Sequence, residues 1–178
     1  LVDMEDRGIE SFRIHNDDTI PRGKLDVVDF IFSNKCNLAC RMCDPQTSHR
    51  LMLDYEFFSK AGLLHEVEES TSGKFRGRIT IPKTSNSKQF LWLLNNPLKE
   101  LRFSGGEPFF DAQVIKLLDK YIDKGWAQNT ILAYHTNGTM FNPTLINKLN
   151  KFKKQYPKLS IDAVEECYEY IRHPQSFD

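Results

Sequence analysis

Three of the four cysteines in this chain fall in one short stretch, Cys36-Asn37-Leu38-Ala39-Cys40-Arg41-Met42-Cys43, with the spacing C-x3-C-x2-C. Thiolates are soft ligands that favour iron–sulfur clusters, zinc or copper. The short spacers allow one loop, called here the cysteine loop (residues 36–43), to turn three sulfurs toward a common centre. Simple iron–sulfur electron carriers usually supply a cysteine to every iron. The fourth cysteine, Cys167, is far along the chain, so a four-iron cluster here would have one iron without a protein thiolate. An open metal position is where chemistry takes place.

Two other interpretations of the cysteine loop stay open from spacing alone. One is a structural zinc site completed by His49, and the other is three unrelated buried cysteines. The other histidines show no ligand spacing. His135 precedes a turn, where it either faces a substrate or, as is more common for a strand histidine, is simply packed. Cys167 lies on the apolar side of an expected helix, where a buried structural thiol is the better interpretation.

Composition narrows the class of protein. The 178 residues include 24 basic and 24 acidic side chains, so no net charge favours nucleic acid or an anionic membrane as a partner. No apolar run approaches the roughly 20 residues of a membrane-spanning helix. The first ten residues are rich in charge and do not resemble a signal peptide. Clustered reduced cysteines fit a cytoplasmic location better than a disulfide framework. A first residue other than methionine suggests a fragment of a longer protein.

The elements that must position the cysteine loop follow from hydrophobic patterning. Strands are expected at 25–33, 98–104, 130–135 and 158–162, and helices at 46–59, 88–96, from Asp111 to Gly125, from Asn142 to Phe152 and from Val164 to Ile171. Repeated strand, loop and helix indicates an α/β fold with a parallel sheet and right-handed crossovers. Functional sites in such folds lie at the carboxyl ends of the strands.

Two segments lie outside this repeat. Residues 1–24 are expected to form a lead-in arm, and residues 25–178 the main domain, interrupted by an irregular insertion at about 60–88. The second half of the insertion is basic from Lys74 to Lys88. Such a run is more often a solvated loop or hairpin than a nucleic-acid contact.

Every unusual loop follows an expected strand. They are the cysteine loop, Gly105-Gly106-Glu107-Pro108, Thr136-Asn137-Gly138-Thr139 and Ser160-Ile161-Asp162. The second of these, called here the glycine turn (residues 105–108), has a backbone that can approach a ligand closely. The Glu107 carboxylate is suited to accept a hydrogen bond from an ammonium group. A plain strand-to-helix turn is the alternative.

The cysteine loop and the glycine turn, in this order, resemble the two motifs of the radical S-adenosylmethionine (radical SAM) enzymes. The resemblance implies that Cys36, Cys40 and Cys43 ligate a [4Fe-4S] cluster whose fourth iron is chelated by S-adenosyl-L-methionine. It also implies that the glycine turn, with Gly105, Gly106 and Glu107, contacts the amino group of the cofactor.

Further cofactor contacts follow from the same resemblance. Met42 stands where the family often has an aromatic residue beside the adenine. Ser160 and Asp162 resemble positions that contact the ribose or carboxylate, and Asn137 is placed to meet cofactor or substrate. The structural alternatives are an Asx turn at Asn137 and a helix N-cap at Asp162.

The fold implied by the resemblance is a partial (β/α)6 TIM-like barrel. About four of its six β/α units are expected in this chain, which would then be C-terminally incomplete. The opening Arg7-Gly8-Ile9-Glu10-Ser11-Phe12-Arg13-Ile14-His15-Asn16 resembles members that carry a C-terminal twitch domain.

The implied activity is reductive cleavage of S-adenosylmethionine to a 5′-deoxyadenosyl radical that abstracts hydrogen from a substrate. The implied reductant is flavodoxin or ferredoxin, and the twitch-domain subgroup suggests a peptide or protein substrate. The rival interpretation is a non-enzymatic iron–sulfur or zinc protein, which would have no need of the glycine turn.

The cysteine assignment makes a direct prediction. Replacing Cys36, Cys40 or Cys43 with alanine should abolish iron binding after anaerobic reconstitution, because each removes a thiolate ligand. Cys167→Ala is the matched control and should retain the iron. Iron and sulfide analysis of the four variants measures this, and equal loss of iron in Cys167→Ala would refute the three-cysteine site.

Overall fold

The computed structural model describes residues 11–14, 25–63 and 88–177, and for 11–14 it describes the backbone alone. The strands are β1 (Ser11–Ile14), β2 (Val27–Ile31), β3 (Glu100–Ser104), β4 (Ile131–Thr136) and β5 (Lys154–Leu159). They form one sheet in the order β1-β2-β3-β4-β5, and every neighbouring pair is parallel. The parallel α/β architecture expected from the sequence is therefore confirmed.

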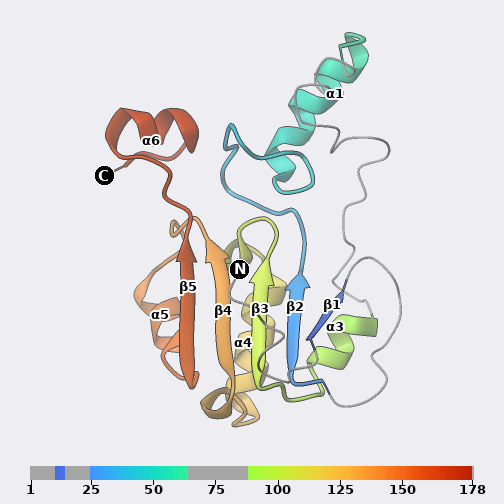
Figure 1. Ribbon diagram of the computed structural model, residues 1–178, viewed down its shortest axis with the longest axis vertical. Helices are drawn as coiled ribbons and strands as arrows, with labels where there is room; N and C mark the ends of the chain where they lie inside the picture. The colour runs from blue at the N-terminus through green and yellow to red at the C-terminus, as the bar shows by residue number, and fades with distance from the viewer. Residues whose placement is uncertain (1–10, 15–24, 64–87, 178) are drawn as a thin grey trace.

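The helices divide into two groups (Figure 1). They are α1 (Met52–Lys60), α3 (Lys88–Leu93), α4 (Ala112–Asp123), α5 (Pro143–Leu149) and α6 (Glu165–Ile171), with short 3-10 turns at His49–Leu51, Pro108–Phe110 and Ala127–Asn129. Helices α3, α4 and α5 contribute to the hydrophobic core beside the sheet. Helices α1 and α6 stand beyond the carboxyl ends of the strands, where the site was expected.

The core occupies one face of the sheet. Strand residues that point to it alternate with residues that do not, and the buried ones include Val28, Phe30, Leu101, Phe103, Leu132 and Tyr134. Helix α4 covers them with Val114, Leu117, Leu118 and Tyr121. Its first turn is capped by Asp111, whose carboxylate accepts a hydrogen bond from Gln113 N at 2.9 Å. This alternation replaces the fully buried strand expected at 25–33.

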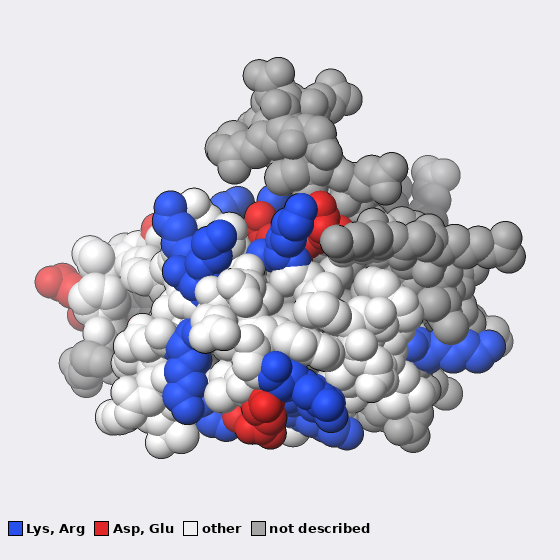
Figure 2. Space-filling model, turned by 90° about the horizontal axis from the view of Figure 1, so that it is seen from below, with Lys and Arg blue, Asp and Glu red and all other residues white. Residues whose placement is uncertain are grey.

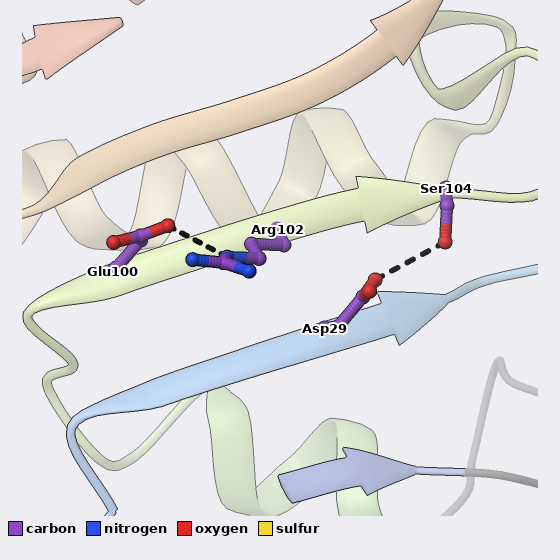
Figure 3. A network of polar contacts seen from close by, with 4 residues as sticks. All are labelled: Asp29, Glu100, Arg102 and Ser104. Carbon is purple, nitrogen blue, oxygen red and sulfur yellow. Dashed lines mark hydrogen bonds and ion pairs between the residues drawn. The ribbon is translucent and has the colours of Figure 1, made fainter. Parts of the chain in front are cut away.

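The opposite face of the sheet carries polar side chains on β2 and β3 (Figure 3). On β3, Arg102 Nε lies 2.7 Å from Glu100 Oε1. Ser104 Oγ donates to Asp29 Oδ1 of β2 at 3.1 Å, near the carboxyl ends of both strands. His135 of β4 is exposed rather than packed as expected. The ion pair lies within β3, and the serine hydroxyl links β3 to the carboxylate of β2.

Two strands differ from the sequence-based prediction. The lead-in arm contributes β1, which pairs with β2 and gives the described sheet five strands rather than four. The last strand spans 154–159 instead of 158–162, and Pro157 lies inside it opposite Tyr134. Proline is tolerated there because β5 pairs only with β4 among the described strands.

Helix α6 buries Tyr168 and leaves Cys167 exposed, so the prediction that Cys167 is a buried structural thiol is wrong. The basic stretch of the insertion lies mostly in 64–87, outside the described residues. None of the described helices is long and apolar enough to span a membrane.

The end of the molecule opposite the cysteine loop is shown in Figure 2. Lys and Arg side chains are spaced around the described surface there, with acidic side chains beside some of them. Lys99, which precedes β3, is paired with Asp26 at 2.7 Å. Exposed pairs of this kind are worth about 0–1 kcal/mol, so they matter little for the fold.

The core predicts a clear contrast between two leucines. Leu117→Ala should lower the free energy of unfolding by about 2–5 kcal/mol, because Leu117 is 0% exposed and its removal leaves a cavity. Leu53→Ala is the control, since Leu53 of α1 is 74% exposed and should change stability by no more than about 0.5 kcal/mol. Urea unfolding monitored by circular dichroism tests this, and equal midpoints would contradict the assigned core.

Candidate metal and cofactor site

The cysteine loop is anchored by the glycine turn. Gly106 N donates to Ser33 O at 3.2 Å, and Glu107 N donates to Lys35 O at 2.8 Å. A Cβ atom on residue 106 would lie only 2.1 Å from Lys35 O, so glycine is required there. The chain that leads from β2 into the cysteine loop therefore rests directly on the turn that follows β3.

Gly105 has two reasons to be glycine. Its φ of +112° lies in a region that L side chains rarely adopt, and a Cβ there would lie 2.8 Å from Ile31 Cγ2. The sequence predicted close approach of this backbone to a ligand. In the structure, the close approach at both glycines is to β2 and to the residues that follow it.

The three thiols of the cysteine loop gather in one cluster. Cys36 and Cys40 are buried around Leu38, and Cys43 packs against them. Other groups donate to two of the sulfurs: Leu38 N to Cys36 Sγ at 3.4 Å, Asn137 Nδ2 to Cys36 Sγ at 3.8 Å, and Arg172 Nη1 to Cys40 Sγ at 3.6 Å. Donors directed at sulfur stabilise the thiolate form, which is the metal-binding form. This donor set fits an iron–sulfur cluster, although no three ligating side chains in the described residues already surround one point.

The three thiols differ in pKa because their surroundings differ. A hydrogen bond from Cys43 and the nearby Arg172 lower the pKa of Cys40 to about 7. The same hydrogen bond, together with burial, raises the pKa of Cys43. Burial raises the pKa of Cys36. Cys40 is thus the thiol that ionises first, and Cys43 is its donor.

A cavity of about 480 Å³ adjoins this cluster on the side of α1. Cys40 and Cys43 form part of its wall, opposite Tyr55 and Phe58 of α1. Its volume lies in the range of small-molecule sites, which are mostly apolar with a few polar groups. The cysteine loop therefore borders a space large enough for an organic ligand.

The Glu107 carboxylate joins the glycine turn to the end of β4. It is 1% exposed, and its oxygens accept from Thr136 Oγ1 at 2.8 Å, Asn137 N at 2.8 Å and Phe109 N at 3.2 Å. Burial raises the pKa of Glu107, and these three donors counteract the rise. Protein groups thus use most of the acceptor capacity that was expected to meet an ammonium group.

Asn137 forms the Asx turn that was weighed as its structural role, and it also reaches the cysteine loop. Its Oδ1 accepts from Thr139 N at 3.0 Å, while its Nδ2 donates to Asn37 Oδ1 at 3.0 Å as well as to Cys36 Sγ. The end of β4 is therefore linked to the first cysteine.

The remaining expected site residues are less closely assembled. Met42 of the cysteine loop is 54% exposed. Ser160 follows β5, and its backbone N–H donates to Thr136 O at 2.8 Å. Asp162 pairs with Arg172 instead of capping α6, whose N-cap residue is Val164. His49 accepts from Cys36 N at 3.1 Å through Nδ1, so this nitrogen is not directed at a zinc ion.

The end of α6 holds the cysteine loop, and sequence reasoning did not predict this contact. Ala39 N donates to His173 O at 2.7 Å and Arg41 N donates to Ile171 O at 3.0 Å. The Arg41 guanidinium also lies 3.8 Å from the centroid of the Tyr170 ring. These contacts join positions far apart in sequence, and no local motif predicts them.

Comparison with known proteins gives one match. A family model described as the Radical SAM superfamily matches residues 30–178, which include the cysteine loop, the glycine turn and α6. No curated protein and no solved structure matches the chain. The parallel strands, with helices against one face, are consistent with a partial β/α barrel.

The docking of the two loops predicts an effect on metal binding. Gly106→Ala should cost about 1–3 kcal/mol in stability and lower the iron content after reconstitution, because the new Cβ displaces Lys35 and the loop beyond it. Gly125→Ala is the control, since Gly125 has φ +69° but open space around its Cβ position. It should cost about 1–2 kcal/mol and leave the iron content unchanged. Full iron content in Gly106→Ala would show that the contact does not position the cysteines.

Proposed function

This chain belongs to the radical SAM superfamily, and from that premise we propose that it holds a [4Fe-4S] cluster on Cys36, Cys40 and Cys43 and acts on S-adenosyl-L-methionine. The observation that carries the proposal is the contact of the glycine turn, through Gly106 N and Glu107 N, with residues 33–35, which lead into the cysteine loop. It brings the two motif-bearing loops together at the carboxyl ends of β2 and β3.

The thiol cluster supports the cluster assignment. The three thiols of one loop pack together, two of them buried and Cys43 partly buried, and donors from Leu38, Asn137 and Arg172 reach two of the sulfurs. When bound, a reduced cluster would supply the electron that cleaves the C–S bond of S-adenosylmethionine, giving methionine and a 5′-deoxyadenosyl radical that takes a hydrogen atom from substrate.

The protein's own groups would hold the cofactor around this site. A carboxylate has about four lone-pair positions, and three protein donors reach Glu107, so we propose that the fourth accepts the cofactor's ammonium group. The Met42 thioether is an exposed apolar group suited to cover an adenine ring. We propose Asn137, Ser160 and Asp162, at the ends of β4 and β5, as the remaining polar contacts.

The substrate would be held over the polar face of the sheet. There Asp29 and Ser104 lie near the strand ends, with the exposed His135 on the neighbouring β4. We propose a peptide or protein substrate and a reductant of the flavodoxin or ferredoxin class. The protein's task is to position these groups and exclude competing reactions.

The rival function is a non-enzymatic iron–sulfur or zinc protein. It requires the thiols but not the linkage of Glu107 to Asn137 N, which ties the glycine turn to β4. His49, the proposed fourth zinc ligand, is hydrogen-bonded through Nδ1 to the backbone of Cys36. Both observations favour the enzyme.

Anaerobic reconstitution tests the proposed function. The chain, loaded with iron and sulfide and given dithionite and S-adenosylmethionine, should release 5′-deoxyadenosine, which chromatography and mass spectrometry measure. Cys167→Ala should retain the activity, because its thiol is exposed and distant in sequence from the loop. An iron-loaded chain that leaves S-adenosylmethionine intact would support the rival.

Glu107 provides a second test. Glu107→Ala should weaken S-adenosylmethionine binding by roughly 10- to 150-fold, since a hydrogen bond to a charged group is worth about 1.5–3 kcal/mol. Thr136→Val removes one protein donor to the same carboxylate and keeps the carboxylate itself. It should therefore weaken binding much less. Calorimetric titration distinguishes the two, and equal losses would mean that Glu107 acts only by holding its turn.

A further inference from the structure

Arg172 is a buried cation beside the thiol cluster. It is 8% exposed, its Nη1 donates to Cys40 Sγ at 3.6 Å, and its Nη2 pairs with Asp162. Arginine is rarely buried unless it is paired, because removing its charge from water is costly. The guanidinium therefore joins a carboxylate after β5 to one of the three sulfurs.

One donor of this guanidinium has no partner among the described residues. Arg172 Nε is buried, and no group in the part of the chain that the structure describes accepts its hydrogen. Buried donors are almost always satisfied, so an unpaired one requires a reason. Because the five N–H groups of arginine lie in one plane, Nε is fixed relative to the Nη1 that meets Cys40. Cys40 Sγ and Asp162 thus orient the planar guanidinium through its two Nη atoms.

The backbone fixes Arg172 and Cys40 in register. The residues on either side of Cys40, Ala39 and Arg41, donate their N–H groups to the carbonyls of His173 and Ile171, which flank Arg172. The two side chains are thus held opposite each other by backbone hydrogen bonds at 2.7 and 3.0 Å. The contact between Arg172 and the Cys40 sulfur therefore follows from the backbone pairing of the end of α6 with the cysteine loop.

We propose that Arg172 is a positioning residue for the Cys40 thiolate that raises the reduction potential of the bound cluster, and that Asp162 is its anchor. The proposal rests on the proposed function. It goes beyond that function because Arg172 is not among the residues expected to contact the cofactor. Reduction adds negative charge to a cluster, and hydrogen bonds to its sulfurs help to set its potential. A cation that donates to Cys40 therefore favours the reduced form. Asp162 serves the arginine in addition to any contact with the cofactor.

The test is a redox titration of the reconstituted chain, followed by electron paramagnetic resonance, in the absence of S-adenosylmethionine. In Arg172→Gln the ratio of reduced to oxidised cluster at a fixed potential should fall about tenfold, which corresponds to a shift of about 59 mV for a one-electron couple. Arg172→Lys keeps the charge but not the planar fork, so it should fall between Gln and the unchanged chain. Asp162→Asn loosens the anchor but also removes a negative charge, and these effects oppose each other, so it should shift the ratio less than Arg172→Gln does.

Arg41→Gln is the matched control. Arg41 is the sequence neighbour of Cys40 and its guanidinium contacts Tyr170 through the ring and through a 2.9 Å hydrogen bond to the carbonyl. The Arg41→Gln substitution weakens the contact between the cysteine loop and the end of α6, but it keeps the Arg172 donor to Cys40 Sγ. The titration curve of Arg41→Gln should therefore match that of the unchanged chain.

Each outcome decides the proposal. Iron content and thermal melting are measured first, and if Arg172→Gln does not hold iron, Arg172→Lys gives the decisive curve. Curves that coincide with the unchanged chain, or an equal shift in Arg41→Gln, would overturn the role of Arg172 and leave the proposed function standing. An unchanged chain that takes up no iron would overturn the proposed function and this inference with it.

Discussion

The structure of the site depends on one close backbone contact, in which residues 33–35 lie against the glycine turn. β2 and β3 are paired so that Ile31 is opposite Ser104, and the two loops therefore leave the sheet at the same level. Gly106 has no side chain to keep them apart, and a Cβ there would meet Lys35 O. From this contact, hydrogen bonds run through the Glu107 carboxylate to Asn137 and on to Cys36. The position of the first cysteine is thus set by three consecutive strands.

Much of the fold could be predicted because its signals are local. Helix α4 has an Asp111 cap, an apolar stripe and a Gly125 end, and it was placed almost to the residue. β5 was misplaced because it is mostly exposed and lacks an apolar pattern, while Pro157 suggested a boundary. β1 lies in a polar arm, and its pairing with β2 is a tertiary preference that no local pattern reveals.

The candidate site also has a part that local motifs predict and a part that depends on tertiary contacts. The C-x3-C-x2-C spacing and the glycine turn are short motifs, so their residues were identified from sequence, while their ligands and roles remain proposals. The partners of those residues come from distant segments. Asp162, which was expected at the cofactor, pairs with Arg172, and Arg172 reaches Cys40 from the end of α6. The sequence alone does not distinguish a buried arginine from an exposed one. Arg172 is identified as buried only by the packing of α6.

The central claim is that three thiolates leave one iron open for S-adenosylmethionine. The most direct measurement is the electron paramagnetic resonance spectrum of the reduced, reconstituted chain with and without cofactor labelled with ¹⁵N at its amino group. The account predicts that the cofactor changes the g values and that electron–nuclear double resonance detects coupling to ¹⁵N. Identical spectra with and without cofactor, and no ¹⁵N coupling, would contradict it.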